Sequence, residues 1–289
     1  MSYKTYIILG MIGFASCKSE KKEVTIKNEE KMEITKREKT EALLRSLETG
    51  DSTAVNYIHP EKYIQHNLGV ADGLEGFGAV LQNAPNGGFK AKVIRTFEDG
   101  DYTFAHTVYD FFGPKIGFDV FRFENGKIVE HWDNLIAMKS PNPSGRTQVD
   151  GETTITDLEK TAENKTLVRN FVSNILVQGQ MDRLGDFIEG DQYLQHNPDI
   201  ADGLSGLGAA LEAMQKNGIA MVYHKVHKVL GEGNFVLAIS EGSFAGVKVS
   251  YYDLFRVAQG KIVEHWDVVE EIAPESEWKH HNGKFNFPE

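Results

Sequence analysis

Two blocks of sequence occur twice in this chain, and this duplication constrains the fold more than any other feature. Residues 63–76 begin Tyr-Ile-Gln-His-Asn, include Ala-Asp-Gly, and recur as residues 193–206. Residues 119–133 end Gly-Lys-Ile-Val-Glu-His-Trp-Asp and recur as residues 253–267. Two blocks in the same order at nearly the same separation indicate a duplicated domain rather than a solenoid of short repeats. Each copy spans roughly 105–115 residues, which is long enough to bury a core.

The composition is that of an ordinary globular protein. The 289 residues are 40% apolar and 25% charged, which excludes collagen, wholesale disorder and a disulfide-stapled miniprotein. Lys and Arg total 31 against 42 Asp and Glu, so the chain lacks the basic field that attracts nucleic acid, and we expect no nucleic-acid partner. The single cysteine, Cys17, allows neither an intrachain disulfide nor a cysteine metal cluster.

Cys17 ends the one segment that resembles a targeting signal. A short positive start is followed by a mostly apolar run over residues 6–15 and by a charged segment over residues 18–23. The apolar run is too short to span a membrane but suits a signal-peptide core. It resembles a bacterial lipoprotein signal, which implies a lipid anchor on Cys17 and a location in the cell envelope, at the outer membrane or surface. An ordinary secretory signal or a buried N-terminal strand is the alternative.

Hydropathy and composition divide the rest of the chain. We expect a signal peptide over residues 1–17, a charged tether over 18–35, a first domain over 36–139, a linker over 140–160, a second domain over 161–274 and a polar tail over 275–289. Helical spacing predicts helices over residues 38–47, 52–58 and 74–83, and again over 162–177, 181–188 and 204–217. Asp72 and Asp202 could cap the third helix of each copy.

Alternating β-rich runs follow the helices in both copies. They cover residues 91–97, 102–111, 116–123 and 127–135, and then 221–230, 235–244, 248–257 and 261–269. Asn125-Gly126 predicts a tight hairpin turn before the last strand, and Gln259-Gly260 is its weaker counterpart. Helices followed by an antiparallel meander predict an α+β fold in which helices cover one face of a curved sheet.

Together, the two repeated blocks resemble the SnoaL-like polyketide cyclase group of the nuclear-transport-factor-2-like superfamily. The resemblance covers both copies, and it implies two tandem cone-shaped domains that pair within the chain as a pseudo-dimer. It leaves the function open, because this superfamily is similar across cyclases, isomerases, dehydratases and binding modules.

By this resemblance, Asp133 and Asp267 take the role of the acid and base that moves the proton in an intramolecular aldol closure. An apolar cone suits this role, because desolvation raises the pKa of a carboxyl group toward working pH. Those cyclases carry a histidine where this sequence has Asp119 and Asp253, so the assisting group is changed. The alternative is a carboxylate held in a structural or dimer network.

His66 and His196 are the candidate assisting groups in the first repeated block. A neutral imidazole there could polarise a substrate carbonyl or accept a proton. The alternative is a hydrogen bond that locks the loop before the third helix. Pro198 occurs only in the second copy, with Leu68 at the matching position, so the second domain fits the family pattern better and is expected to hold the more competent pocket.

Strand alternation leaves open which face of the last strand lines the cavity. With a two-residue turn over residues 125–126, Asp119 would pair with Trp132, while His131 and Asp133 would point the other way. A β-bulge would bring the two sets together.

Aromatic side chains and histidines of the same blocks are expected to wall the cavity and contact the ligand: Trp132 and Trp266, Phe121 and Phe255, Tyr63 and Tyr193, and His131 and His265. A metal set could combine His66 with His131, or His196 with His265, and one aspartate. No closely spaced ligand pair of the zinc-helix type occurs, however, and we expect neither a metal nor another cofactor.

These observations predict a lipid-anchored protein whose two pockets accept a small hydrophobic molecule bearing a carbonyl group. If it is an enzyme, the natural class is aldol-type cyclisation, isomerisation or dehydration. The alternative is a non-catalytic binding or assembly module for a hydrophobic ligand or a protein partner. The two differ in whether the four aspartates face a cavity or an interface. A cut within residues 140–156 is expected to leave two separately soluble pieces that reassociate.

Overall fold

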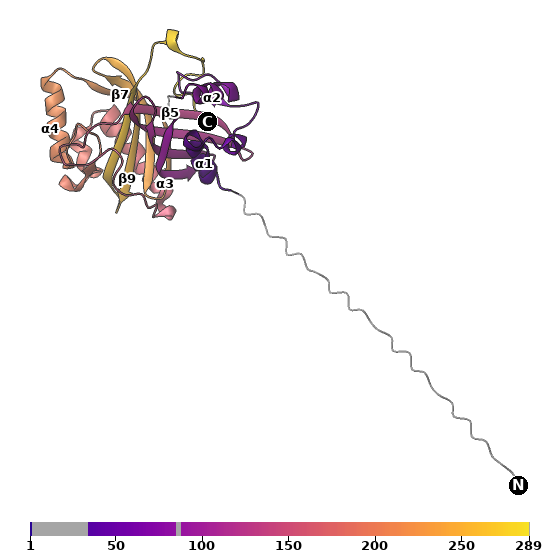
Figure 1. Ribbon diagram of the computed structural model, residues 1–289. Helices are drawn as coiled ribbons and strands as arrows, with labels where there is room; N and C mark the ends of the chain where they lie inside the picture. Colours follow the sequence, from indigo (N-terminus) through magenta and orange to yellow (C-terminus); the bar gives the residue numbers. More distant parts are fainter. Residues whose placement is uncertain (2–33, 85–87, 289) are drawn as a thin grey trace. The chain divides into compact units, whose positions relative to one another are not determined.

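The structure is a computed structural model, and it describes residue 1, residues 34–84 and residues 88–288 (Figure 1). Cys17 and the expected signal peptide beyond Met1 lie outside the described residues, as does nearly all of the expected tether. No helix in the described part of the chain is long and apolar enough to cross a bilayer.

The first domain begins with helix α1 (Lys36–Thr49), which Thr35 caps. The hydroxyl of Thr35 accepts from the backbone N–H of Glu38, and the Glu38 carboxylate accepts from the backbone N–H of Thr35. The other elements are η1 (Ser52–Tyr57), β1 (Ile64–Gln65), α2 (Gly73–Gln82), β2 (Lys90–Asp99), β3 (Tyr102–Asp110), β4 (Pro114–Glu124) and β5 (Lys127–Ala137). Their sheet has the order β1-β5-β4-β3-β2, with β1 parallel to β5.

The second domain repeats this arrangement, with the sheet order β6-β10-β9-β8-β7. Its elements are η2 (Leu158–Lys160), α3 (Thr161–Phe171), η3 (Val172–Val177), η4 (Met181–Asp186), η5 (Gly190–Gln192), β6 (Leu194–Gln195), α4 (Gly203–Lys216), β7 (Met221–Glu232), β8 (Phe235–Phe244), β9 (Val247–Ala258) and β10 (Lys261–Glu271), and η6 (Glu275–Glu277) follows. The helix expected over residues 162–177 changes to π-helical geometry at η3. The expected α+β fold of two tandem cones is confirmed.

The hairpin before the last strand combines the expected turn with a bulge. Asn125 and Gly126 have φ values of 48° and 74°, and the turn before β10 has the same left-handed pair. Arg122 pairs with Glu130 but Phe123 pairs with Ile128, so Val129 is an extra residue in β5. β10 has the same shift between Ile262 and Glu264. The bulge is therefore the alternative that the structure shows.

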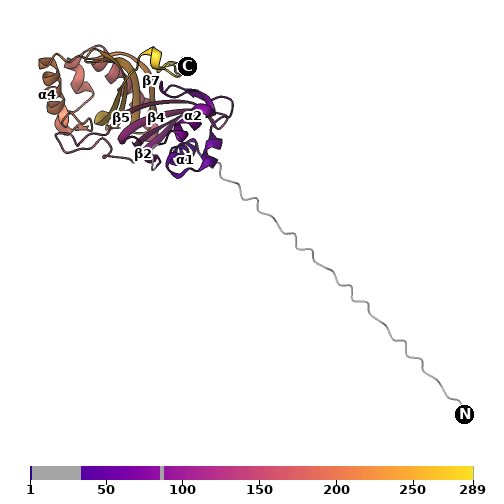
Figure 2. The same cartoon turned by 45° about the horizontal axis from the view of Figure 1, so that its top comes forward.

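Each sheet has one face that packs against the helices of its own domain. In the first domain, Leu43 and Leu44 of α1 pack with Tyr63, Phe121 and other buried residues. In the second, residues of α3 and η3 pack with the sheet around Phe255. Both views show the strands between α1 and α4 (Figures 1 and 2). These two cores are the interiors of the cones.

The opposite faces of the two sheets form a third core that both domains share. Its buried members include Phe97, Phe104, Ile116, Phe118, Val120 and Trp132 from the first domain, and Leu230, Phe235, Leu237, Ile239, Tyr252, Leu254, Trp266 and Val268 from the second. The Asn134 amide crosses this core and donates to the carbonyl oxygens of Ser250 and Val268, both at 2.8 Å. The domains are therefore packed through an apolar interface of the kind found inside single domains.

Two segments that the sequence suggests are free connections are docked on the domains. The linker strap (residues 140–156) holds the second domain, since the Asn142 amide donates to the carbonyl oxygens of Gln195 and Ile200 at 2.7 and 2.9 Å. The tail strap (residues 275–288) holds the first domain, since the Asn282 amide donates to the carbonyl oxygen of Gln65 at 3.0 Å. The tail after the second domain thus completes the first.

Asp72 and Asp202 stand at the N-cap positions of α2 and α4, but neither side chain caps its helix. Each carboxylate instead accepts from the backbone N–H of the glutamine in the short strand before it, Gln65 or Gln195, at 2.8 and 2.9 Å. The capping prediction is therefore wrong in its hydrogen bond, and the carboxylates tie the loop of the first block together.

Candidate functional site

The bulge in each last strand brings the motif carboxylates onto one face. Asp119 of β4 pairs directly with Asp133 of β5, and Phe121 pairs with His131 two residues away. Side chains two residues apart on a strand share a face, so both carboxylates and the imidazole point into the cone. Asp119 and Asp133 are each 3% exposed. The second domain has the same pairing between β9 and β10: Asp253 with Asp267, and Phe255 with His265.

In the first domain the polar cluster is held by hydrogen bonds from four elements. The His131 ring places Nε2 3.3 Å from Asp119 Oδ1 and Nδ1 3.1 Å from Gln65 Oε1. Tyr109 donates its hydroxyl proton to Asp119 Oδ2 at 2.8 Å. The Asn67 amide donates to Asp133 Oδ2 at 2.7 Å. Every side chain of the cluster is thus oriented by a partner.

The second domain repeats this network with the matching residues. His265 Nε2 lies 3.1 Å from Asp253 Oδ1, and His265 Nδ1 lies 3.1 Å from Gln195 Oε1. The Tyr223 hydroxyl lies 3.2 Å from both carboxylate oxygens of Asp253, to which it donates. The Asn197 amide donates to Asp267 Oδ2 at 2.7 Å. Two independent copies of one polar constellation therefore occur in one chain.

The cluster of the first domain closes the polar end of a cavity of about 170 Å³. Its walls are mainly apolar and come from α1, α2 and the sheet, including Leu44, Phe77 and Phe121. Asp119, His131 and Asp133 all line it. Asp133 Oδ1 is buried and has no hydrogen-bond partner in the described residues; the Lys284 ammonium lies 4.0 Å away.

Burial controls the charge of this cluster. It raises the pKa of Asp119, as does the charge of Asp133, while His131 opposes the shift. Burial likewise raises the pKa of Asp267, and the charge of Asp253 adds to that effect against His265. Each cone therefore holds a buried carboxyl group with a raised pKa, which is Asp119 of β4 in the first cone and Asp267 of β10 in the second.

His66 does not line the cavity of the first cone, and both His66 and His196 are hydrogen-bonded to a glutamate, which argues against their expected catalytic role. His66 places Nδ1 2.6 Å from the Gly283 carbonyl oxygen and Nε2 2.8 Å from Glu130 Oε1, and His196 makes the matching contact with Glu264 at 2.9 Å. Successive side chains of a strand point to opposite faces of the sheet, and each histidine comes directly after the cone-facing glutamine of its short strand. Each ring therefore points away from the cone. They lock the loop to the straps, which was the alternative interpretation.

Trp132 and Trp266 also lie in the shared core instead of walling a cone. Each indole stacks on the loop histidine of its domain, with ring centroids 4.4 Å apart for His66 and 4.6 Å for His196. Each tryptophan follows a cone-facing histidine by one residue and therefore points to the other side of the sheet. Of the aromatic residues expected at the ligand, Tyr63 and Phe121 line the first cavity.

Tyr193 and Phe255 are buried on the matching cone-facing side of the second domain. Both rings stack on His265, with centroids 6.4 and 4.7 Å from the imidazole. They therefore occupy the positions that Tyr63 and Phe121 hold in the first domain.

Several residues of the cluster were not anticipated from the sequence. Gln65 and Asn67 stand beside His66 in the first repeated block, so their repetition was an available signal. Tyr109 and Tyr223 had no such signal, because Tyr109 comes from β3 and Tyr223 from β7, which are not matching strands. In both cones a tyrosine hydroxyl donates to the aspartate, but the tyrosine comes from a different strand of the sheet in each domain.

A metal ion could be ligated by the same residues rather than by the set considered from the sequence. One atom each of Asp119, His131 and Asp133 lie within 4.8 Å of one another, as do those of the matching second-domain residues. His66 and His196 are bonded on the other side of the sheet and join neither group.

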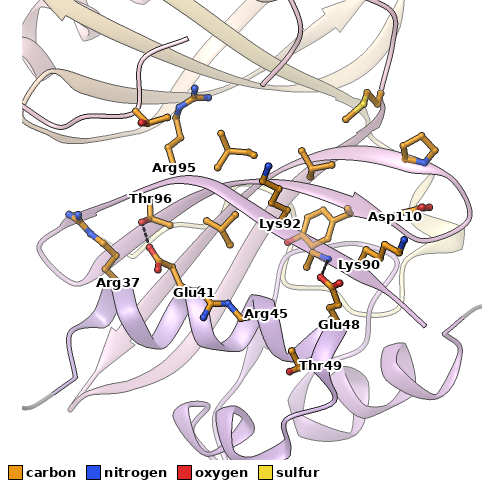
Figure 3. A pocket seen from close by; sticks show the side chains of 18 of the residues that line it. Arg37, Glu41, Arg45, Glu48, Thr49, Lys90, Lys92, Arg95, Thr96 and Asp110 are labelled. Carbon is orange, nitrogen blue, oxygen red and sulfur yellow. Dashed lines mark hydrogen bonds between the residues drawn. The ribbon is translucent and has the colours of Figure 1, made fainter. Parts of the chain in front are cut away.

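A larger, open groove of about 1120 Å³ is lined by residues of α1, β2, the end of β3 and the linker strap (Figure 3). Its charged side chains have both signs: Arg37, Arg45, Lys90, Lys92 and Arg95 with Glu41, Glu48 and Asp110. Part of this polarity is already satisfied, since the Thr96 hydroxyl donates to Glu41 at 2.6 Å. Because the groove contains no residue of the repeated blocks, the smaller cavity is the stronger candidate site.

Comparison with known proteins finds a family model that matches part of the second domain, and solved structures that are similar to part of the chain. Among curated proteins none matches this chain. Similar solved structures include a protein of unknown function with a cystatin-like fold from Xanthomonas campestris, 23% identical, covering 39% of this chain and 93% of that chain with a TM-score of 0.31. An NTF-2 like protein of unknown function from Burkholderia xenovorans is 20% identical over 43% and 99%, with a TM-score of 0.34.

A third similar structure, a SnoaL-like polyketide cyclase from Agrobacterium tumefaciens, is 14% identical over 37% of this chain and 91% of that chain, with a TM-score of 0.30. The family model described as SnoaL-like polyketide cyclase matches residues 166–277, which include β6, the polar cluster of the second cone and the whole of β10. The family match therefore lies within the second domain and covers residues 166–277.

Proposed function

We propose that each cone binds a small hydrophobic carbonyl compound and catalyses proton transfer on it without a cofactor, with Asp133 and Asp267 moving the proton. The observation that carries this proposal is the duplicated cluster of two aspartates and one histidine on the cone-facing side of each sheet. An apolar cavity with a few convergent polar groups is the usual form of a small-molecule site.

Asp133 Oδ1 is the atom suited to act as the base in the first cone. It is buried without a hydrogen-bond partner in the described residues, while Asn67 holds the other carboxylate oxygen. It would take a proton from the carbon next to the ligand carbonyl, and the electron pair of the broken C–H bond would form an enolate. The enolate carbon then attacks a second carbonyl of the ligand, or is reprotonated elsewhere for isomerisation.

The Asp119–His131 pair supplies the assisting group in place of the histidine of the cyclases. His131 Nδ1 faces the Gln65 carbonyl oxygen and must donate to it, so one further proton lies between Nε2 and Asp119. That proton can be passed to the alkoxide that forms in an aldol closure. The pair is thus arranged as an acid beside the base.

The competing function is a non-catalytic binding or assembly module. As an assembly module it would place the four aspartates on an interface between proteins, and as a binding module for a hydrophobic ligand it would use the cavity without proton transfer. Asp119 and Asp133 instead line a cavity inside the first cone, and the shared core of the domains is made by other residues. This placement favours chemistry on a ligand over assembly.

The test is turnover of a panel of small ketones and enones by Asp133→Asn, Asp267→Asn and the double variant. Asn keeps the shape but cannot carry the proton, so kcat should fall steeply in Asp267→Asn and by roughly 100-fold or more in the double variant. Asp182→Asn on the exposed surface is the matched control. Wild-type kcat in the double variant would refute the acid–base assignment, and loss of folding would identify structural carboxylates.

We also propose that a lipid on Cys17 anchors the protein in the cell envelope, at the outer membrane or surface. The support is the order of a positive start, an apolar run and a cysteine in the sequence. In cell fractionation, Cys17→Ala should move the protein from the membrane to the soluble periplasmic or secreted pool, because the acyl chains are lost. A variant that stays with the membrane fraction would exclude this anchor.

A further inference from the structure

Two tyrosines approach the polar cluster of the first cone, and they use their hydroxyl groups differently. Tyr109 donates its proton to Asp119 Oδ2 at 2.8 Å. The hydroxyl oxygen of Tyr63 instead accepts from the Gln65 amide nitrogen at 3.4 Å. No acceptor within the described residues is recorded for the Tyr63 proton, and Tyr63 lines the cavity together with Asp133.

The second cone fixes the direction of the matching hydrogen bond. Gln195 Oε1 accepts from the backbone N–H groups of His196 and Asn197 at 2.9 and 2.8 Å, and lies 3.1 Å from His265 Nδ1. These donors require the amide oxygen on their side, so the amide nitrogen faces the Tyr193 hydroxyl at 3.3 Å. The oxygen of Tyr193 is therefore an acceptor in this bond, and its own proton is directed elsewhere.

Both phenols stay protonated over the whole range in which the protein would work. Burial, and then the charges of Asp133 and Asp119, raise the pKa of Tyr63 far above its ordinary value. Burial and the charges of Asp267 and Asp253 do the same for the pKa of Tyr193. Each cone thus has one neutral hydroxyl donor beside the carboxylate that acts as the base.

We propose that Tyr63 and Tyr193 are catalytic residues that donate a hydrogen bond to the carbonyl oxygen of the ligand. This inference rests on the proposed function and specifies it further. When Asp133 takes the proton from the carbon next to the carbonyl, the electron pair of that C–H bond moves to form the C=C bond of the enolate. The carbonyl oxygen gains the negative charge, and the Tyr63 O–H bond stays intact while it stabilises that oxygen.

The cavity volume limits the size of this ligand. About 170 Å³ is close to the roughly 150 Å³ of an engineered apolar cavity that binds benzene. A neutral compound with one six-membered ring and a carbonyl group therefore fits the volume of the first cavity. A charged carboxylate ligand is disfavoured, because the cluster already holds two aspartates in an apolar surround.

The test uses 2-cyclohexenone, labelled with ¹³C at the carbonyl carbon, as the probe. On binding to the wild-type protein, its carbonyl stretching band should move to lower frequency, because a hydrogen bond weakens the C=O bond. The double variant Tyr63→Phe with Tyr193→Phe should bind the probe but lose this shift. The double variant Tyr109→Phe with Tyr223→Phe is the matched control, and it should keep the shift because those phenols are committed to Asp119 and Asp253.

The outcomes separate this inference from the proposed function. A shift that survives in Tyr63→Phe with Tyr193→Phe, or a wild-type protein that leaves the probe unbound or unshifted, would overturn the inference. If an enone of the panel is turned over, kcat in this variant should fall about 10²- to 10³-fold. Turnover that needs Asp133 or Asp267 but not the tyrosines would refute the inference alone. Should the double variant misfold, each single variant should lose about half of the shifted band.

Discussion

Leu237→Asp is expected to unfold both domains together. Leu237 is fully buried in the shared core, among apolar side chains from both sheets such as Phe104 and Trp132. An aspartate there would have to bury an unpaired carboxylate, which costs more than about 4 kcal/mol and is comparable to the whole stability of many proteins. Because the core belongs to both domains, the loss should reach the first domain as well as the second.

Thermal unfolding followed by circular dichroism and by tryptophan fluorescence measures this effect. The matched control is Val247→Asp on β9, since Val247 is 42% exposed and its replacement keeps the carboxylate in water. The control should unfold in one transition near the wild-type temperature. Two separate transitions in Leu237→Asp, with the first domain unchanged, would contradict a shared core.

The fold was largely predictable because its strongest signals are local or repeated. The duplicated blocks set two domains, and the Asn125-Gly126 pair set the hairpin, since both residues take the left-handed backbone that this turn requires. The order of helices and strands followed from the change in hydropathy period. These features depend on neighbouring residues, which a single sequence displays directly.

The faces of the strands were less predictable, because one extra residue in a strand moves every later side chain to the other side. Val129 is that residue in β5, and a valine in an apolar strand does not itself indicate a bulge. With the bulge, Asp119 and Asp133 face the cone together, and Trp132 between His131 and Asp133 is turned toward the other domain. The wall of a ligand cavity and the core of an interface have the same apolar composition. The sequence therefore does not show on which face of the sheet each tryptophan lies.

Contacts between segments that are distant in the chain could not be predicted from the sequence. Lys284 of the tail strap donates to the Asp133 carbonyl oxygen at 2.7 Å and pairs with Glu270 at 2.5 Å, which joins the tail to both domains. A polar segment after the last strand has the composition of a free tail. Only the three-dimensional path shows that its lysine ends beside a carboxylate of the other cone.

This path changes what is expected when the chain is cut. The sequence suggested two separately soluble pieces, but the first piece, residues 34–139, would expose Phe104, Phe118 and Trp132 to water. It would also lose the tail strap that holds its loop through Asn282. Produced alone, it should therefore precipitate or associate with itself. Produced together with residues 140–289, it should form a soluble one-to-one complex.

Size-exclusion chromatography with light scattering distinguishes these outcomes, with the uncut chain as the reference. The cut after Lys139 leaves the linker strap attached to the second domain, whose loop it holds through Asn142, so the second piece keeps its own strap. The first piece depends on its partner for both the apolar cover and the tail. A monomeric, soluble first piece would show that its exposed sheet face is tolerated in water, and the shared core would then be an association of independent domains.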